Sequence, residues 1–292
     1  MSTQLVAVLG RGVVDPETPV LFADDAGLTR GDGCFDTCRV VRDDAGTRVD
    51  HLERHLARFA HSAELLSLPA PDLGAWRALI DEATAAWAVP GEAALKLVLT
   101  RGPEHTPGTP TGLLLLTAVD GVALARSRRG LRVVTLDRGY ASDVFAAAPW
   151  LLGGAKSLSY GVNVAAKREA TARGADDVLF VSTDGYALEG PTSGLLVAAG
   201  GGRLVAVPGG ATGVLESVTV GVILEAAGGA GMCAGFELLR PAGLLESRGA
   251  WLVSTVRGVC PILQLDGRPM PHDPALTAVL ARSAGFEPLA TS

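Results

Sequence analysis

The chain has only three lysines, Lys96, Lys156 and Lys167, among its 25 basic residues, so a reaction that needs a lysine amine has three candidates. Lys156 stands out because small and apolar residues flank it, in the sequence Gly-Gly-Ala-Lys-Ser-Leu-Ser over 153–159. Burial in such surroundings lowers the pKa of an amine, and an amine of lowered pKa can form an imine or remove a proton from carbon. Taken alone, the stretch favours the simpler alternative, a surface lysine whose methylene chain lies along apolar surface.

Glu189, which follows Lys156 along the chain, is the next residue whose type and surroundings suggest a role in chemistry. It lies after an apolar strand and a turn and before another apolar strand. A carboxylate that is buried between strands needs a partner, because burying it unpaired is costly. A protonated pyridine nitrogen would be a suitable partner, whereas position alone favours a glutamate in a surface turn.

Other familiar catalytic motifs do not fit the sequence. The stretch 153–157 resembles the end of a phosphate-binding loop, but Ala155 stands where that loop requires a glycine beside the lysine. No glycine-rich dinucleotide motif opens a helix after a strand, and no G-x-S-x-G nucleophile turn occurs. The histidines and cysteines lack metal-ligand spacing, so we expect no metal site. The four cysteines, which we expect to be small buried residues in a reducing compartment, are Cys34, Cys38, Cys233 and Cys260.

Composition excludes several classes of protein. Of the 292 residues 48% are hydrophobic and 19% are charged, which excludes disorder as the main state. The formal charge of −6 argues against binding to nucleic acid, which depends on clustered Lys and Arg. No apolar run approaches the roughly 20 residues that span a bilayer. The first residues, MSTQLVAVLGRG, lack the features of a secretory signal, so we expect a cytoplasmic protein that binds no membrane.

The elements that position Lys156 and Glu189 alternate between strands and helices. After residue 130 the apolar patterns predict helices over 159–173 and 215–228. They predict strands over 131–136, 177–182, 195–199, 203–206, 235–239 and 250–254. Lys156 therefore precedes a helix, and Glu189 lies between two strands.

The first part of the chain predicts a smaller α+β arrangement. Helices are expected over 52–66 and 73–88, and the Pro- and Gly-rich stretch 102–112 is expected to be a loop, either a hairpin connection or a flap over a site. Strands are expected over 5–9, 19–22, 33–42, 94–100 and 113–119. The segment 120–130 has little periodicity and suits a domain boundary. We therefore predict a mixed α/β protein with a small α+β domain over 1–122 and a larger domain over 123–292.

Five stretches, taken together, resemble the class IV aminotransferases, the fold-type IV enzymes that bind pyridoxal 5′-phosphate (PLP). They occur in the order of that family and extend over most of the chain. Any one of them is a weak signal, and the collinear set is a specific one. The stretches are Arg30-Gly-Asp-Gly-Cys-Phe-Asp-Thr37, His55-Leu-Ala-Arg-Phe59, Lys156-Ser-Leu-Ser-Tyr160, Leu188-Glu-Gly190, and Ser254-Thr255 followed by Pro261.

The resemblance implies a role in cofactor binding for each matching residue. Lys156 matches the lysine that holds PLP covalently and is also the catalytic base. Glu189 matches the carboxylate that keeps the pyridine nitrogen protonated. Arg58 matches the arginine that binds the phosphate, Tyr160 the tyrosine that hydrogen-bonds the phenolic oxygen, and Thr255 a phosphate-binding hydroxyl.

The phosphate-binding turn departs from the family pattern. The family has a Gly-Ile-Thr-Arg-like turn whose backbone N–H groups hold the phosphate, and here the turn reads Gly213-Val-Leu-Glu216. The amides of Val214 and Leu215 match the family's donors. The threonine hydroxyl is missing, however, and Glu216 brings a negative charge.

Within the family, the chain is most similar to the aminodeoxychorismate lyase branch. The stretch Gly31-Asp-Gly-Cys-Phe-Asp-Thr37 matches the lyase pattern Gly-Asp-Gly-Cys-Phe-Thr-Thr except at Asp36. The Arg-x-His clamp of the D-amino-acid transaminases is missing from the loop that begins at Pro103. We expect Arg101, with Thr37 nearby, to bind a substrate carboxylate, unless Arg101 is only a structural ion-pair partner.

The function that the resemblance implies is conversion of 4-amino-4-deoxychorismate to 4-aminobenzoate and pyruvate for folate synthesis. In that reaction the amine of Lys156 removes the proton at C4 of the substrate. A transaminase acting on D- or branched-chain amino acids is the main alternative, and a non-catalytic homologue that binds a small molecule is a second one. Members of the family are typically homodimers, so we expect a homodimer here.

Overall fold

The computed structural model describes residues 3–287 and contains two compact units. The first unit comprises Met1–Gly121 together with Ala155–Tyr160, and the second comprises Val122–Gly154 and Gly161–Ser292. Residues 155–160 are called the Lys156 segment below. The domain boundary predicted at residue 122 would place this segment in the larger domain, whereas its contacts group it with the first unit.

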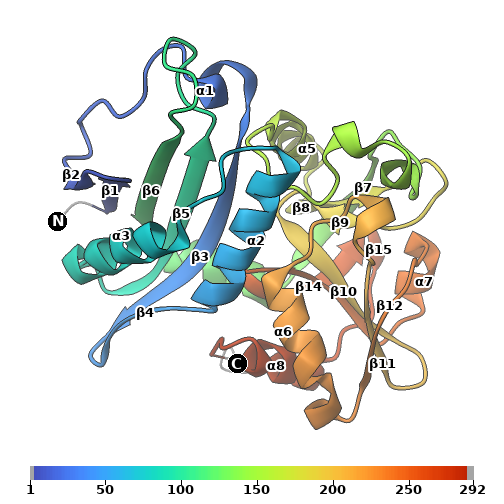
Figure 1. Cartoon of the computed structure of the whole chain (residues 1–292). Helices are drawn as coiled ribbons and strands as arrows, with labels where there is room; N and C mark the ends of the chain where they lie inside the picture. The colour runs from blue at the N-terminus through green and yellow to red at the C-terminus, as the bar shows by residue number, and fades with distance from the viewer. Residues whose placement is uncertain (1–2, 288–292) are drawn as a thin grey trace. The chain divides into compact units, whose positions relative to one another are not determined.

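The first unit is built on a six-stranded sheet in the order β2-β1-β6-β5-β3-β4 (Figure 1). Every neighbouring pair in it is antiparallel. The strands are β1 (Gln4–Val8), β2 (Gly12–Val14), β3 (Gly33–Asp43), β4 (Gly46–Val49), β5 (Gly91–Thr100) and β6 (Thr111–Ala118). The strands expected over 33–42, 94–100 and 113–119 are confirmed. The strand expected over 19–22 is wrong, because these residues have no regular secondary structure apart from a bend at Leu21.

Two helices cover one face of this sheet. They are α2 (Leu52–Leu65) and α3 (Leu73–Ala86), close to the predicted ranges, and a short helix α1 (Ala26–Arg30) precedes β3. Alternate residues of β3 point to opposite faces. Cys34, Asp36, Cys38 and Val40 are completely buried, and the Asp36 side chain bonds to α2. Phe35 and Thr37 therefore belong to the other face.

A helix lies in the segment that the sequence indicated as a domain boundary. Residues Gly121–Arg129 form α4, a helix that the weak periodicity of 120–130 did not predict. Leu124 is its buried residue, and three arginines lie in its last turn. A single buried side chain in nine residues leaves almost no periodic signal, while basic side chains at a helix C-terminus interact favourably with the helix dipole.

The second unit contains a mixed sheet in the order β12-β11-β10-β13-β14-β7-β8, with β9 beside β10 and β15 beside β14. The pairs β11/β12, β14/β7 and β7/β8 are parallel and the others antiparallel. Its strands are β7 (Leu131–Asp137), β8 (Asp177–Val181), β9 (Glu189–Gly190), β10 (Ser193–Ala199), β11 (Arg203–Ala206), β12 (Cys233–Phe236), β13 (Gly249–Ser254), β14 (Gly258–Leu265) and β15 (Arg268–Pro269).

Helices pack on both faces of this second sheet. Along β10, Leu195 and Val197 belong to one apolar cluster with residues of α5, while Leu196 and Ala198 belong to another with residues of α6 and α8. The helices are α5 (Gly161–Ala172), α6 (Val218–Ala226), α7 (Pro241–Leu245) and α8 (Pro274–Ser283), with 3₁₀ turns at Val144–Ala146, Pro149–Leu151, Gly210–Thr212 and Ala227–Ala230. The helix expected over 215–228 begins later because Ser217 caps it by accepting from the Val220 N–H.

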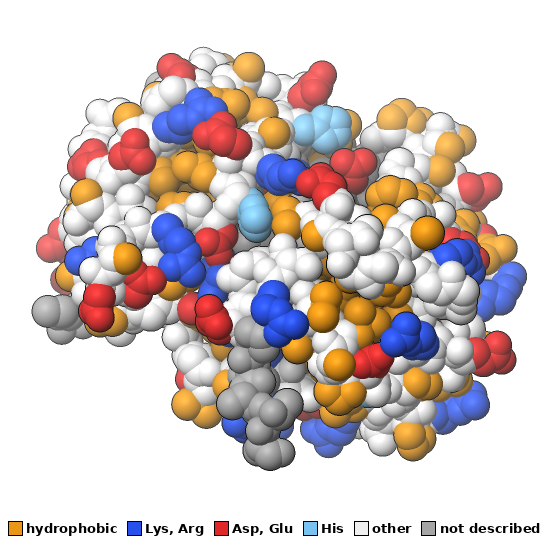
Figure 2. All heavy atoms as spheres, turned by 90° about the horizontal axis from the view of Figure 1, so that it is seen from below, with side chains coloured by type: hydrophobic (Ala, Val, Ile, Leu, Met, Phe, Trp, Pro, Cys, Tyr) orange, Lys and Arg blue, Asp and Glu red, His pale blue; other side chains and the backbone are white. Residues whose placement is uncertain are grey.

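Three cysteines are buried free thiols as expected, but Cys233 is exposed, because it begins the edge strand β12, which has a neighbour on one side only. Basic, acidic and hydrophobic side chains are intermixed on the face shown in Figure 2. Within residues 3–287, no helix combines the length and apolarity needed to cross a membrane.

Candidate active site

Backbone hydrogen bonds fix the position of Lys156 in the first unit. The N–H of Phe35 donates to the Lys156 carbonyl at 2.9 Å, and the N–H of Leu158 donates to the Gly33 carbonyl at 2.8 Å. The Lys156 N–H donates to Oγ of Ser62 on α2 at 3.1 Å. The Lys156 segment thus lies along the first residues of β3, which β4 does not reach because it pairs only with Val40 onwards.

The Lys156 side chain lies against an aromatic pair. Its Nζ is 4.8 Å from the centroid of the Phe35 ring, a cation–π distance. The Phe35 ring meets the Tyr160 ring edge-to-face, with 5.3 Å between centroids. Phe35 and Tyr160 belong to an apolar cluster on this face with Val8 and Val98. Two residues that the sequence placed in one site, Lys156 and Tyr160, are therefore brought together.

A second lysine shares the same ring. Nζ of Lys96 is 5.4 Å from the Phe35 centroid, and Lys96 pairs with Thr37 in the β3/β5 ladder. Phe35, Thr37 and Lys96 therefore lie on one face of the sheet, beside the Lys156 amine. Lys96 was not among the expected site residues. Its position could have indicated a role, because it is a charged residue within the apolar run Leu95-Lys-Leu-Val-Leu99 of a buried strand.

Arg58 is held by a buried carboxylate. Its Nε donates to Oδ2 of Asp36 and its Nη2 to Oδ1, each at 2.8 Å, and Nδ1 of His55 lies 2.8 Å from Oδ1. Asp36 and His55 are fully buried, and the Arg58 side chain is 11% exposed. Arg58 is four residues before Ser62 on α2, and residues at that spacing share a helix face. The guanidinium therefore lies on the side of α2 that contacts the Lys156 backbone.

Burial and ion pairing shift the pKa values around Asp36. Burial raises the pKa of the Asp36 carboxyl, but the hydrogen bonds from Arg58 and His55 outweigh this effect and hold it well below its ordinary value. Burial lowers the pKa of His55 despite the bond to Asp36. Burial also raises the pKa of the Cys34 thiol to about 12. The network is thus a carboxylate with a guanidinium and a neutral imidazole.

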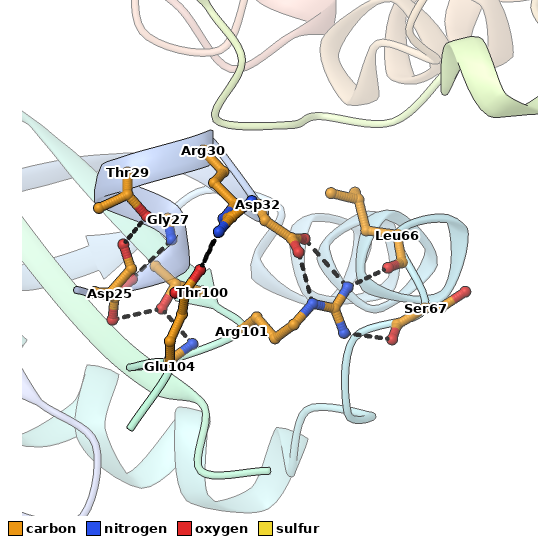
Figure 3. Close-up of polar contacts among 11 residues, drawn as sticks. Asp25, Gly27, Thr29, Arg30, Asp32, Leu66, Ser67, Thr100, Arg101 and Glu104 are labelled. Atoms are coloured by element: carbon orange, nitrogen blue, oxygen red, sulfur yellow. Dashed lines mark hydrogen bonds and ion pairs between the residues drawn. The ribbon is translucent and has the colours of Figure 1, made fainter. Parts of the chain in front are cut away.

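Arg101 is engaged in structural bonds (Figure 3). Its Nε donates to Oδ2 of Asp32 at 2.6 Å, and its Nη2 donates to Oδ1 of Asp32 at 3.1 Å and to the Leu66 carbonyl at 2.9 Å. Its Nη1 donates to the carbonyl of Ser67 at 3.1 Å. Arg101 therefore ties the residues that follow α2 to the start of β3, the structural role that the sequence left open.

The expected proximity of Arg101 and Thr37 is wrong. In the β3/β5 ladder Thr37 faces Lys96 and Gly33 faces Thr100, so Arg101 lies about five residues further along the sheet than Thr37. At roughly 3.3 Å per residue, this separates their backbones by about 16 Å. Local sequence does not reveal this, because the register of a hairpin decides which residues meet.

In the second unit, Glu189 opens β9 and is half-buried. Its Oε2 accepts from the Leu215 N–H at 3.3 Å. Burial raises the pKa of Tyr140, and the charge of Glu189 is a further, smaller cause, which places the phenol in the electrostatic surroundings of the carboxylate. Arg138 Nε donates to the Tyr140 hydroxyl at 3.0 Å. Glu189 thus combines one backbone donor with a nearby phenol that the sequence did not suggest.

The two amides expected at the phosphate have acceptors within the second unit. The N–H of Val214 donates to Oγ1 of Thr212 at 3.1 Å, and the N–H of Leu215 donates to Glu189. Phosphate binding by the amides of Val214 and Leu215 stays a prediction, and it requires both N–H groups to exchange these acceptors for phosphate oxygens. A side-chain acceptor two residues away, as Thr212 is here, competes with a ligand for the same N–H.

Thr255 is paired with a threonine that the sequence analysis did not name. Its Oγ1 lies 3.2 Å from Oγ1 of Thr219, and Thr219 is buried in the first turn of α6. Ser217, the N-cap of α6, precedes it by two residues. The donors that the second unit offers to an anion are thus the hydroxyls of Thr219 and Thr255 near a helix N-terminus, where anions are favoured.

The groups in both units have the chemistry that PLP requires of its binding residues. The first unit provides an amine beside aromatic rings and a guanidinium held at a fixed orientation. The second provides a half-buried carboxylate and a pair of hydroxyls. Arg58 suits a phosphate because its planar fork binds phosphate oxygens in pairs, and Glu189 suits a pyridine N–H because it already accepts one N–H.

Comparison with known proteins identifies the family. The model for amino-transferase class IV matches residues 33–265. A bifunctional aminodeoxychorismate lyase / D-amino acid transaminase from Mycobacterium tuberculosis is 39% identical over 277 residues, which cover 92% of this chain and 94% of that protein.

Solved structures agree with this match. The PLP-bound form of a hypothetical aminotransferase from Mycobacterium tuberculosis has a TM-score of 0.89 at 38% identity and 97% coverage of both chains. A structure described as its α-ketoglutarate and PMP bound form has a TM-score of 0.90 at 39% identity, covering 96% of this chain and 98% of that one. The mixed α/β fold class expected from the sequence is confirmed. The chain belongs to the class IV aminotransferase family.

Proposed function

We propose that the protein is a PLP-dependent 4-amino-4-deoxychorismate lyase, which releases 4-aminobenzoate and pyruvate. The observation that carries the proposal is the Lys156 amine, which lies beside the Phe35 ring on a segment anchored by backbone hydrogen bonds. The lyase-like stretch that ends at Thr37 supports the choice of reaction, as does the relative from Mycobacterium tuberculosis whose name includes this activity.

The residues that hold the cofactor in this proposal are assigned one by one from the family resemblance. When bound, PLP supplies an aldehyde that joins covalently to an amine and a pyridine ring that withdraws electrons. Lys156 holds the aldehyde carbon, Arg58 binds the phosphate, and Tyr160 donates to the phenolic oxygen. Glu189 keeps a proton on the pyridine nitrogen. In the second unit we assign the phosphate to the hydroxyls of Thr255 and Thr219, with the amides of Val214 and Leu215 joining only if they leave their present acceptors.

The proton transfer that the lyase requires is assigned to Lys156. With PLP bound and the substrate amine held in place of Lys156, the Lys156 amine would be free to remove the proton from C4 of the substrate. The enolpyruvyl group would then leave as enolpyruvate, which takes up a proton to become pyruvate, and the ring that remains is aromatic, which favours this direction. The Phe35 ring lies beside this amine and the Tyr160 ring packs edge-to-face on Phe35, so apolar surface borders the amine.

The substrate carboxylates are assigned to Lys96 and Thr37 in place of Arg101. Aminodeoxychorismate carries two carboxylates, and Lys96 presents an ammonium group on the face that carries Phe35 and the Lys156 amine. Thr37 is its cross-strand neighbour and can add a hydroxyl donor. Arg101 is about 16 Å further along the sheet and already bonded.

D-amino acid transamination is the second candidate, because the relative from Mycobacterium tuberculosis is named as bifunctional. The similar structure with α-ketoglutarate and PMP points the same way. The deciding experiment measures pyruvate release from aminodeoxychorismate in the absence of any keto acid, with D-alanine plus α-ketoglutarate as the comparison. Pyruvate release without a keto acid supports the lyase. Activity only when both D-alanine and α-ketoglutarate are present would favour the transaminase.

We also infer a cytoplasmic homodimer. Apolar side chains that usually find a partner are exposed on the second unit: Trp150 is 74% exposed, Val162 is 60% exposed, and Leu151 and Val164 are exposed as well. A second copy of the chain is the occupant expected from the family. Light scattering coupled to gel filtration tests this, since a dimer mass is expected and a monomer mass at micromolar concentration would contradict it.

A further inference from the structure

Asp36 is the one residue at which the lyase-like stretch departs from its pattern, which has threonine there. In the structure this residue is a fully buried carboxylate that accepts four hydrogen bonds. The donors to Oδ1 are His55 Nδ1, Arg58 Nη2 and the Thr37 N–H at 2.7–2.8 Å, and the donor to Oδ2 is Arg58 Nε at 2.8 Å. A threonine hydroxyl has a single oxygen and no charge, so it cannot bind a guanidinium through two parallel bonds.

The bonds from Asp36 restrict Arg58 in two ways. Two parallel N–H···O contacts set the plane of the guanidinium as well as its position. His55, which is also buried on α2, prevents the carboxylate from turning, because its ring occupies the same oxygen that accepts from Arg58 Nη2. Arg58 therefore has one orientation before any ligand arrives, and no rotamer freedom is lost on binding.

The same contacts neutralise Arg58. The guanidinium and the Asp36 carboxylate together have no net charge, and His55 is neutral in these surroundings. Arg58 thus attracts an anion less by net charge than by N–H groups held in a fixed direction. A phosphate monoester is the ligand that suits this arrangement best, because its tetrahedral oxygens match a guanidinium group held in a fixed direction.

We propose that Asp36, locked by His55, is the positioning residue that aims Arg58 at the cofactor phosphate. This inference rests on the proposed function, in which Arg58 binds that phosphate. It predicts that loss of the Asp36 charge weakens binding through the phosphate and leaves covalent attachment at Lys156 intact, because Lys156 is anchored by its own bonds to Phe35 and Ser62.

The test compares PLP with pyridoxal, which has the same aldehyde and ring but no phosphate. Apoprotein of the wild type and of Asp36→Asn is titrated with each compound, and covalent attachment is followed by its yellow absorbance and by borohydride trapping. We expect Asp36→Asn to weaken PLP binding about 10- to 100-fold, the effect of losing an oriented charged hydrogen bond. We expect pyridoxal binding to change by less than about twofold.

Asp50→Asn is the matched control. Asp50 is a largely buried carboxylate of the same unit that pairs with Arg39, and Arg39 keeps Glu92 as a second partner. This variant is expected to leave the ratio of PLP to pyridoxal affinity unchanged. Equal weakening of both compounds by Asp36→Asn would show a merely structural role and overturn the inference. A wild-type protein that attaches neither compound would overturn the proposed function and this inference with it, and is recognised by its missing absorbance band.

A second measurement needs no variant. The Arg58 Nε–H signal in the NMR spectrum of wild-type apoprotein is expected to be restrained on the nanosecond timescale and protected from exchange, because Asp36 holds it without a ligand. A mobile, rapidly exchanging Arg58 side chain in the apoprotein would overturn the inference even if Asp36→Asn fails to fold.

Discussion

Exchange of Lys96 for methionine removes one ammonium group from the face of the sheet that carries Lys156. Methionine keeps the length and most of the volume of the side chain, so the apolar contacts around Phe35 remain. The lost interaction is a charged hydrogen bond to a substrate carboxylate, which is worth about 1.5–3 kcal/mol. Since about 1.4 kcal/mol corresponds to a factor of ten, we expect the KM for aminodeoxychorismate to rise about 10- to 150-fold.

Arg101→Met is the matched comparison, because it also removes one cation, from the residue that directly follows β5. Its side chain is 41% exposed, so solvent screens the ion pair with Asp32, and the loss is about 1–2 kcal/mol including the bonds to Leu66 and Ser67. We expect a melting temperature lower by about 2–5 °C, with KM within about twofold of the wild type.

The assay couples pyruvate release to lactate dehydrogenase and separates KM from kcat, while the melting temperature is followed by circular dichroism. We expect a kinetic defect without a stability defect for Lys96→Met, and a stability defect without a kinetic defect for Arg101→Met. A large rise in KM for Arg101→Met, with Lys96→Met unaffected, would refute the assignment drawn from the sheet register.

Three further outcomes follow from other parts of the structure. Glu189→Gln keeps an acceptor for the Leu215 N–H and is expected to attach PLP but to slow turnover about 100-fold or more; a near-normal rate in the coupled assay would contradict the role of this carboxylate. A thiol reagent is expected to modify only Cys233 in the native protein, because the other three cysteines are buried, and mass spectrometry showing a second modified thiol would contradict this. Burial lowers the pKa of His55, so below about pH 6.5 the unfolded state binds the proton more readily and the free energy of unfolding declines. Urea titrations at pH 7.5 and 5.5 test this, and His55→Gln is expected to flatten the decline; an unchanged slope would count against it.

Much of the fold could be predicted from local patterns. The apolar spacing of α2 and the β-rich run of β3 were identified within a few residues, because one face of each is buried and shapes the sequence accordingly. Helix α4 and strand β14 (Gly258–Leu265) were missed. The first buries one residue, and the second contains Pro261, which weakens a strand signal.

The site could be predicted only where one residue type is rare or sits in a characteristic context. Lys156 and Glu189 were named from their neighbours and from the resemblance of the chain to a family. The sequence left the role of Arg101 open and did not single out Lys96, because hairpin register brings residues together across strands. It also could not show that Leu215 donates to Glu189, since 26 residues separate them along the chain.

The central claim is that one amine, that of Lys156, carries the cofactor. The most direct test incubates the protein with PLP, reduces it with sodium borohydride and maps the pyridoxyl group by peptide mass spectrometry, with Lys156→Ala as the control. Because the chain has only three lysines, the result is unambiguous. We expect a single adduct at Lys156 that is lost in the variant. An adduct at Lys96 or Lys167 alone, or no adduct at all, would contradict it.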